Sequence, residues 1–285
     1  MAVAAIGESR PDWLSLTLSK RHGFTRQVSV SSSALGVSRY VAKIETCWMR
    51  QDRSGVTFAL AEEIAYKICK LFHWNTVPKT KVLHQLSEQS EKYEWYFHWM
   101  SPFIESNPGL VEAKAPMTFT FQTYVEGRDL SNRKESETLK PNLSAFQKAY
   151  LLQMIMSNSD CRRDNMILNS ETGELFLVDN EYIGCPVNCY GSLKDFSALE
   201  EEPISAEIIK EFMQASASQL KIVQSKYEPR ERSIRSLWMG EAFPRGHLDP
   251  SKVYAEAWDR LIARFQTLQT ILHALSQEGT VATMR

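Results

Sequence analysis

The sequence predicts an α+β fold with two lobes, in which a β-rich N-terminal half with one helix precedes a mostly helical C-terminal half. Three observations predict it. Short alternating apolar runs fill much of the first half, and apolar residues at helical spacing dominate from about residue 144. A polar and charged stretch, residues 126–144, separates the two patterns and is expected to be an exposed linker. We therefore expect an N-lobe of residues 1–127 and a C-lobe of residues 128–285.

The N-terminal half contains one predicted helix among short strands. Leu60, Ile64 and Ile68 recur at helical spacing within residues 58–72, and the Pro-containing segment 74–78 ends that pattern. Alternating or β-branched runs predict strands at 27–30, 39–45, 79–83, 93–99 and 117–125.

The C-terminal half begins with an amphipathic helix over residues 145–156, for which Ser144 is the expected N-cap. Short apolar strands are expected at 166–168 and 175–178, joined by a turn at 170–173. Helices are expected after residue 203, the last over 251–275. The charged segment 226–235 is expected to be a solvated face.

Composition excludes several classes of protein. The chain has 285 residues, 43% hydrophobic and 24% charged, which is ordinary for a globular protein and unlike a disordered one. The net charge of −1 gives no basic surplus for nucleic acid. No apolar run is long enough for a transmembrane segment, and the N-terminus does not resemble a secretory signal. The five scattered cysteines indicate reduced thiols, so we expect a cytoplasmic location, or delivery into a host cell without a cleavable signal peptide.

The segment 157–168 and the residue Asp179 carry the most specific chemical signal. Asp160, Asn165 and Asp179 all lie in predicted loops at the ends of a helix and two short strands. Phosphoryl transfer from a nucleotide needs one carboxylate to orient the attacking hydroxyl, and a second carboxylate with an amide oxygen to hold Mg²⁺. The spacing from Asp160 to Asn165 matches the catalytic loop of protein kinases. We therefore assign Asp160 to the acceptor, and Asn165 and Asp179 to the metal.

These segments resemble the catalytic segments of atypical kinases, notably type II phosphatidylinositol 4-kinases and the actin-fragmin kinase. Their signature has the approximate form N-T-D-R-x-x-D-N followed downstream by I-D-N, which Asn158–Asn165 and Asp179-Asn180 fill here. Cys161 stands where those families usually carry Arg, and Arg162 or Arg163 is the expected substitute. The close match covers about 25 residues, and the order of elements over most of the chain is compatible with it. The resemblance implies a two-lobed protein-kinase-like fold, with a β-rich N-lobe and a mostly helical C-lobe.

The resemblance implies a nucleotide-anchoring Lys in the N-lobe, and Lys43 on the alternating strand 39–45 supplies it. Such a Lys contacts the α- and β-phosphates, and a helical Glu orients it through an ion pair. Glu62 and Glu63 both begin the next helix about 100° apart, so one of them is expected to face inward. The family pattern favours Glu62, and the alternative is an acidic first turn that favours the helix dipole.

The resemblance also implies where the nucleotide is held. In the loop between the first two strands, Ser32, Ser33 and Gly36 are expected to bind phosphate through backbone N–H groups and hydroxyls. Gln122, Tyr124 and Val125 lie where such kinases place the hinge that hydrogen-bonds adenine. The alternatives are an exposed hairpin turn and an ordinary strand leaving a sheet.

The expected function is that of an ATP- and Mg²⁺-dependent phosphotransferase, with Mn²⁺ as an alternative metal. The chain shows no cysteine cluster or polybasic run that would help it dock to a bilayer, so a Ser or Thr of a protein is favoured over a phosphoinositide. Three alternatives remain open: a phosphoinositide kinase, a pseudokinase acting as a scaffold, and a nucleotidyl transferase on the same fold. The size and the loose relation to eukaryotic families are compatible with a bacterial effector.

Overall fold

The computed structural model describes residues 19–20, 25–32, 36–46, 58–84, 117–131, 141–186, 202–242 and 250–277. Helices and strands both occur, as the predicted α+β class requires. The chain divides into two compact units, the first made of residues 1–54, 80–124 and 233–247, and the second of residues 55–79, 125–232 and 248–285. The kinase-like pairing of two lobes and the boundary at residue 127 stay predictions.

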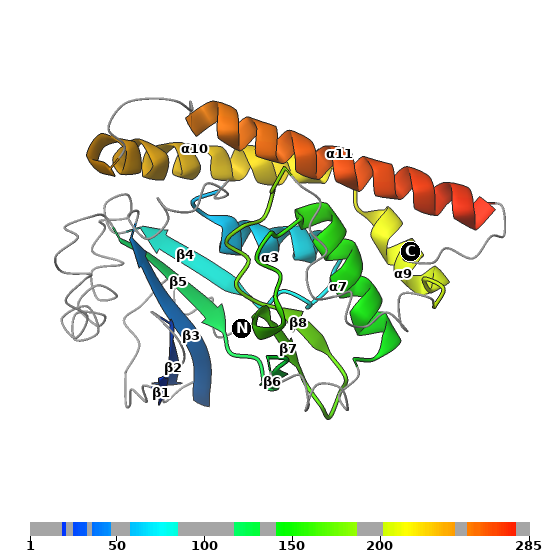
Figure 1. The fold of residues 1–285 in the computed structure, drawn as a ribbon, viewed down its shortest axis with the longest axis horizontal. Coiled ribbons are helices and arrows are strands. Elements are labelled where there is room, and N and C mark those ends of the chain that lie inside the picture. The colour runs from blue at the N-terminus through cyan, green and yellow to red at the C-terminus, as the bar shows by residue number, and fades with distance from the viewer. Residues whose placement is uncertain are drawn as a thin grey trace. The chain divides into compact units, whose positions relative to one another are not determined.

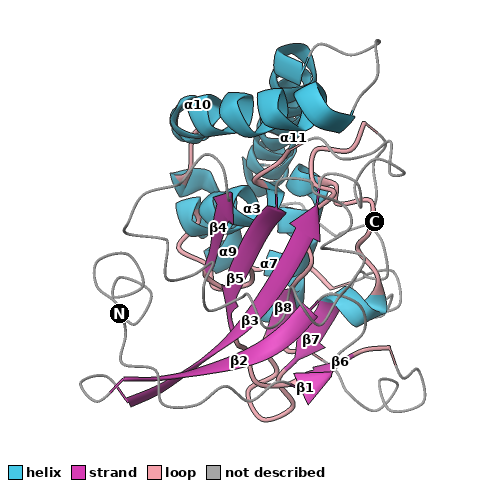
Figure 2. Ribbon diagram, turned by 90° about the vertical axis from the view of Figure 1, so that its left-hand side faces the viewer, coloured by secondary structure: helices cyan, strands magenta, loops and turns pink. Residues whose placement is uncertain are grey.

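The first unit contains an antiparallel sheet whose strands follow the order β1-β2-β3-β5-β4. Figure 2 shows the longer strands of this sheet side by side. Their bounds are β1 Ser19–Lys20, β2 Thr25–Ser32, β3 Gly36–Thr46, β4 Thr80–His84 and β5 Met117–Thr123. The strands predicted at 27–30, 39–45, 79–83 and 117–125 are all present, and the one predicted at 93–99 lies outside the described residues.

The second unit contains a three-stranded antiparallel sheet, β6-β7-β8, together with several helices (Figure 1). Helix α3 belongs to this unit, although its residues fall within the segment expected to form the N-lobe. The strands of this unit are β6 Arg128–Asp129, β7 Met166–Leu168 and β8 Leu175–Leu177. Its helices are α3 Ala61–Leu71, α7 Leu143–Met156, the 3₁₀ helix η1 Arg163–Asn165, α9 Ala206–Gln214, α10 Ala217–Ala242 and α11 Pro250–Gln277. The last part of α10, residues 233–242, belongs to the first unit.

Helix α7 begins two residues earlier than the sequence suggested, and its N-cap is Asn142 instead of Ser144. Asn142 has an extended backbone, and its Oδ1 accepts a hydrogen bond from the N–H of Ala145 at 2.7 Å. The amide oxygen reaches the third helical N–H group, as a good N-cap does. The backbone N–H of Asn142 also donates to Gly173 O, which joins the helix start to the β7–β8 turn.

The segment predicted as an exposed linker is structured at its start. The exposed strand β6 pairs with β7, and Leu130 after it is fully buried, which the polar composition did not indicate. Gly127 precedes β6 with φ of 149°, and a Cβ there would lie 2.6 Å from the carbonyl oxygen of Leu168. Only glycine fits this close approach of two backbones.

Aromatic side chains form much of the core of the second unit. Phe72, after the end of α3, stacks on Phe212 of α9 with ring centroids 5.0 Å apart and on Trp74 at 4.8 Å. Phe265 of α11 packs against Phe212 at 5.4 Å, and Trp258 of the same helix is fully buried. Helices α3, α9 and α11 therefore share one apolar core.

Helix α10 corrects the expectation of a solvated face at 226–235. Tyr227, Glu231 and Ile234 are at most 3% exposed, whereas Glu228 and Arg232 face solvent and form an ion pair at 2.7 Å. The segment forms a helix with one buried face. Its composition did not indicate this face, because two of the buried side chains, Tyr227 and Glu231, are polar. Among the described residues, each helix is too short or too polar to cross a bilayer.

Candidate active site

The loop that follows α7 begins with an abrupt end to the helix. Ser157 takes the left-handed conformation at φ of 46°, and its N–H still donates to Gln153 O at 2.7 Å. The side chain of Gln153 then donates to Asn158 O, and Asn158 Oδ1 accepts from the N–H of Asp160 at 3.1 Å. The buried amide side chains of Gln153 and Asn158 thus fix the conformation of the loop just before Asp160.

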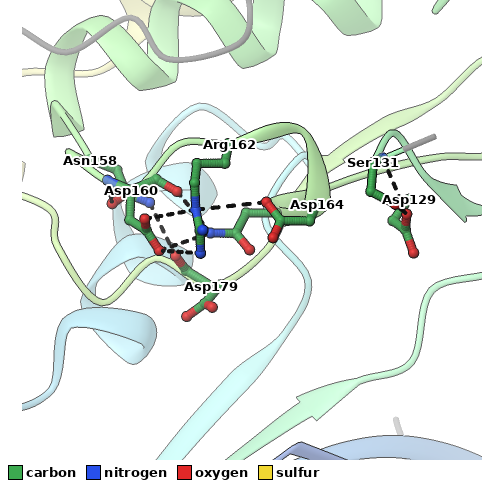
Figure 3. A network of polar contacts seen from close by, with 8 residues as sticks. Asp129, Ser131, Asn158, Asp160, Arg162, Asp164 and Asp179 are labelled. Atoms are coloured by element: carbon green, nitrogen blue, oxygen red, sulfur yellow. Dashed lines mark hydrogen bonds and ion pairs between the residues drawn. The ribbon is translucent and has the colours of Figure 1, made fainter. Parts of the chain in front are cut away.

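Asp160 lies at the centre of a polar network that Figure 3 shows from close by. Its Oδ1 meets Arg162 Nε at 2.9 Å, and its Oδ2 accepts from Arg162 Nη2 and from Asn165 Nδ2, both at 3.2 Å. Asn165 Nδ2 also donates to the backbone oxygen of Asp160 at 2.7 Å. Arg162 and Asn165 therefore fix the orientation of the carboxylate from two sides. The Asp160 side chain is nevertheless 25% exposed to solvent.

Asn165 is held at the end of η1 with its amide oxygen left for another role. Among the described residues, its side chain makes two hydrogen bonds, and both are donated by Nδ2 toward Asp160. Its backbone oxygen accepts from Val178 N at 2.9 Å, which ties η1 to the end of β8. Because amide oxygens are good ligands for Mg²⁺, Oδ1 of Asn165 is suited to a metal-binding role.

Asp179 follows β8 in a left-handed backbone conformation, with φ of 57°. Such a conformation is uncommon for a residue other than glycine, although Asp tolerates it better than most. Asn158 Nδ2 donates to the backbone oxygen of Asp179 at 3.1 Å, and the buried Asn180 donates to Leu177 O. Asn158 therefore joins the loop of Asp160 to the loop of Asp179 (Figure 3).

Three carboxylates meet beside this loop. One oxygen each from Glu62, Asp179 and Glu181 lies within 4.8 Å of the others, and both glutamates are buried. All three are hard oxygen donors, the kind that Mg²⁺ and Ca²⁺ prefer. This set of three carboxylates fits a divalent cation by its chemistry.

The two glutamates at the start of α3 face different partners. Glu62 lies beside Asp179 and Glu181, whereas Glu63 accepts a hydrogen bond from Tyr227 at 2.9 Å and pairs with Arg230 at 3.2 Å. Both side chains are buried, so an exposed acidic first turn does not describe this helix.

The predicted nucleotide-binding residues belong to the first unit. Lys43 lies within β3 opposite Thr25 and Thr120, and Ser32 pairs with Gly36 at the end of the β2–β3 ladder. Their part in binding a nucleotide stays a prediction, and Ser33 lies outside the described residues.

At the expected hinge, the buried Gln122 donates to Thr80 across the sheet at 3.1 Å, and Tyr124 and Val125 follow the end of β5. This cross-strand hydrogen bond uses one N–H of the Gln122 amide, and the part of Gln122, Tyr124 and Val125 in binding adenine stays a prediction.

Sequence reasoning missed Glu181 and did not decide between Arg162 and Arg163. Arg162 is the residue that pairs with Asp160, and it also lies 3.7 Å from a carboxylate oxygen of Asp164. Glu181 follows Asp179 by two positions, so its place near the Asp179 carboxylate could have been considered from the sequence alone. The segment with Tyr190 and Ser192, expected to face the acceptor, lies outside the described residues.

No protein-family model matches the chain, and no curated protein matches it significantly. Among solved structures, the chain is similar to the amicoumacin kinase hAmiN in complex with AMP-PNP, Ca²⁺ and Ami. The two share 13% identity over 94% of this chain and 95% of that chain, with a TM-score of 0.34. A likeness at this level does not establish a shared fold, so the role of the site depends on its own residues.

Proposed function

We propose that this protein is a phosphotransferase that moves the γ-phosphoryl group of ATP to a hydroxyl acceptor with the help of a divalent cation. The observation that carries the proposal is the convergence of Asp160, Asn165 and Asp179, through the hydrogen bonds of Asn158 and of Asn165 itself. That combination of one orienting carboxylate and an adjoining amide–carboxylate pair is what phosphoryl transfer requires.

In this mechanism Asp160 receives the acceptor hydroxyl. Its Oδ1 meets a single cationic partner among the described residues, Arg162, so one lone-pair direction is left for an incoming O–H group. Arg162 and Asn165 hold the carboxylate in place, and the transition state is loose, so the main contribution of Asp160 is to position the hydroxyl. A bound Mg²⁺ or Mn²⁺ would neutralise charge on the phosphates, with Asn165 and Asp179 as its first ligands and Glu62 or Glu181 close enough to join.

The acceptor is proposed to be a Ser or Thr hydroxyl of a protein. Lys43 would hold the α- and β-phosphates in this scheme, and Ser32, Ser33 and Gly36 would bind phosphate oxygens. Lys43→Met should then remove most activity without changing the fold.

Radiolabelled ATP tests the proposal. Label transferred from the γ-phosphate supports a phosphotransferase, label from the α-phosphate indicates nucleotidyl transfer, and no transfer with intact ATP binding indicates a pseudokinase. Offering a protein mixture, phosphoinositide vesicles and small hydroxylated molecules separately would identify the class of acceptor.

Asp164 provides the matched control for Asp160. It lies on the same loop but is 49% exposed, and its nearest cationic contact is long at 3.7 Å. Asp160→Asn should reduce transfer at least about 100-fold, whereas Asp164→Asn should retain it. The opposite result would mean that the catalytic residue lies four positions later and would remove the basis for assigning Asn165.

A further inference from the structure

One face of α10 holds the first turn of α3. Tyr227, Arg230 and Glu231 are spaced i, i+3 and i+4, so their side chains leave the helix on the same side. Tyr227 donates to Glu63 Oε1 at 2.9 Å, and Arg230 Nη1 lies 3.2 Å from Glu63 Oε2. Glu231 accepts hydrogen bonds from the N–H groups of Ala59 and Leu60 at 2.9 and 2.6 Å. We call these three α10 residues the α10 clamp.

Two of the three clamp residues, Tyr227 and Glu231, are buried, and the Arg230 side chain is 28% exposed. Tyr227, Glu63 and Glu231 are 3%, 5% and 1% exposed. Burial, and then the Glu63 carboxylate, raise the pKa of the Tyr227 hydroxyl well above its usual value, so it remains a proton donor at neutral pH. Hydrogen bonds to a carboxylate in such surroundings are stronger than those between neutral groups.

The contacts of Glu63 determine where Glu62 points. Consecutive helical residues leave the axis about 100° apart, so fixing Glu63 against α10 fixes the rotation of α3. Glu231 fixes the position of the helix start at the same time. Glu62 then lies within 4.8 Å of Asp179 and Glu181. Like charges at this distance repel each other, so a helix without such contacts would tend to turn Glu62 away.

We propose that the α10 clamp and Glu63 are positioning residues, which set the affinity of the active site for its divalent cation by holding Glu62 beside Asp179. This inference rests on the proposed function, because it takes Asp179 as a metal-binding residue. None of the clamp residues needs to touch nucleotide, acceptor or metal. Their influence passes through the backbone of α3 to the carboxylate next to Glu63.

The experiment measures Mn²⁺ binding by electron paramagnetic resonance in the presence of AMP-PNP, alongside phosphoryl transfer and melting temperature. Tyr227→Phe removes one hydroxyl and keeps the ring, and Glu63→Gln removes the charge that the clamp binds. Arg232→Gln is the control, because it breaks the exposed ion pair with Glu228 on the same helix. Each variant is also made together with Glu62→Gln.

Tyr227→Phe and Glu63→Gln are expected to weaken Mn²⁺ binding by about tenfold, within the usual range for coupling between sites, and Arg232→Gln to leave it unchanged. With Glu62→Gln present, Tyr227→Phe should cause no further loss of Mn²⁺ affinity while it still lowers the melting temperature. The effects of two substitutions on Mn²⁺ affinity are not additive when one residue acts through the other.

Two results would overturn the inference. Tyr227→Phe could lower the melting temperature with unchanged Mn²⁺ affinity, or its effect on affinity could persist in the Glu62→Gln background. A wild-type protein that binds no Mn²⁺ would overturn it as well. If Tyr227→Phe does not fold, Arg230→Gln carries the same test.

The failure of the inference can be told apart from the failure of the proposed function. A wild-type protein that binds Mn²⁺ in a clamp-dependent way but transfers no γ-phosphate refutes the function and supports the clamp. If the wild-type protein transfers phosphate and the clamp variants bind Mn²⁺ normally, the positioning role of the clamp is refuted and the proposed function is supported.

Discussion

Replacing Glu231 by Gln tests whether a side chain far along the sequence caps α3. The carboxylate accepts two backbone N–H groups, from Ala59 and Leu60, and Leu60 is the N-cap of a helix that has no side-chain cap of its own. Gln has the same shape but only one acceptor oxygen, so its NH₂ group would face one of the two N–H donors. That donor would be left buried without a partner.

The magnitude follows from the number and type of these contacts. A hydrogen bond to a charged group contributes about 1.5–3 kcal/mol, and an unsatisfied buried donor costs about 1–3 kcal/mol. Glu231→Gln loses one such bond and weakens the other, so we expect a loss of about 2–4 kcal/mol in the free energy of unfolding. With a urea m-value of about 2–3 kcal/mol per M, the midpoint should fall by roughly 1 M.

Urea denaturation followed by circular dichroism measures the global effect, and hydrogen exchange of the peptide covering residues 58–72 measures the local one. Glu228→Gln is the control, because Glu228 is exposed and its pair with Arg232 is of the surface type that contributes little. A midpoint for Glu231→Gln equal to that of Glu228→Gln, with unchanged exchange at the start of α3, would refute the capping role.

The other predictions concern catalysis, backbone geometry and a buried thiol. Asp160→Asn should reduce turnover at least 100-fold with little change in ATP affinity, since a positioned base contributes about 10²–10⁴-fold, and retained turnover in a steady-state assay would exclude this role. Asp179→Ala should abolish transfer while keeping the melting temperature within a few degrees, and an active variant would contradict the kinase assignment. Gly127→Ala should destabilise the fold by at least about 2 kcal/mol, because the residue has a φ of 149° and its Cβ would clash with Leu168 O; thermal unfolding close to that of the wild type would contradict this. Burial raises the pKa of the Cys69 thiol from 9.0 to about 11, so the folded protein keeps this proton between those pH values while the unfolded chain loses it. The resulting stabilisation is present below pH 9 and falls as the pH rises to 11, by up to about 3 kcal/mol; wild type and Cys69→Ala with the same pH dependence of unfolding would refute it.

The local pattern of apolar residues predicted most of the helices and strands that the structure describes. The strands at 166–168 and 175–177 and the long last helix match their apolar periodicity, because each buries a face that its own sequence defines. The start of α7 was misplaced, because Asn142 and Ser144 are both good N-cap residues and the choice depends on the contact of Asn142 with the turn at Gly173.

The candidate site was predicted only as far as its residues follow one another in the sequence. Asp160, Asn165 and Asp179 form a recognisable spacing, and their loops are joined by Asn158, which belongs to the same pattern. Glu231 gave no such signal, because its contacts are made with residues more than 170 positions away. A buried carboxylate in a charged segment looks the same as an exposed one until its distant partners are known.

The remote cap on α3 has a consequence for the order in which the protein is made. An isolated helix shorter than about 12–15 residues is marginal in water, and α3 has 11 residues. Residue 231 is synthesised long after Leu60, by roughly 10–30 s at ordinary rates of translation. By the time residue 231 is added, the nascent chain already contains every predicted catalytic residue, but until then the helix that presents Glu62 lacks its cap. We therefore expect the active site to mature late in synthesis, when most of the polypeptide has left the ribosome.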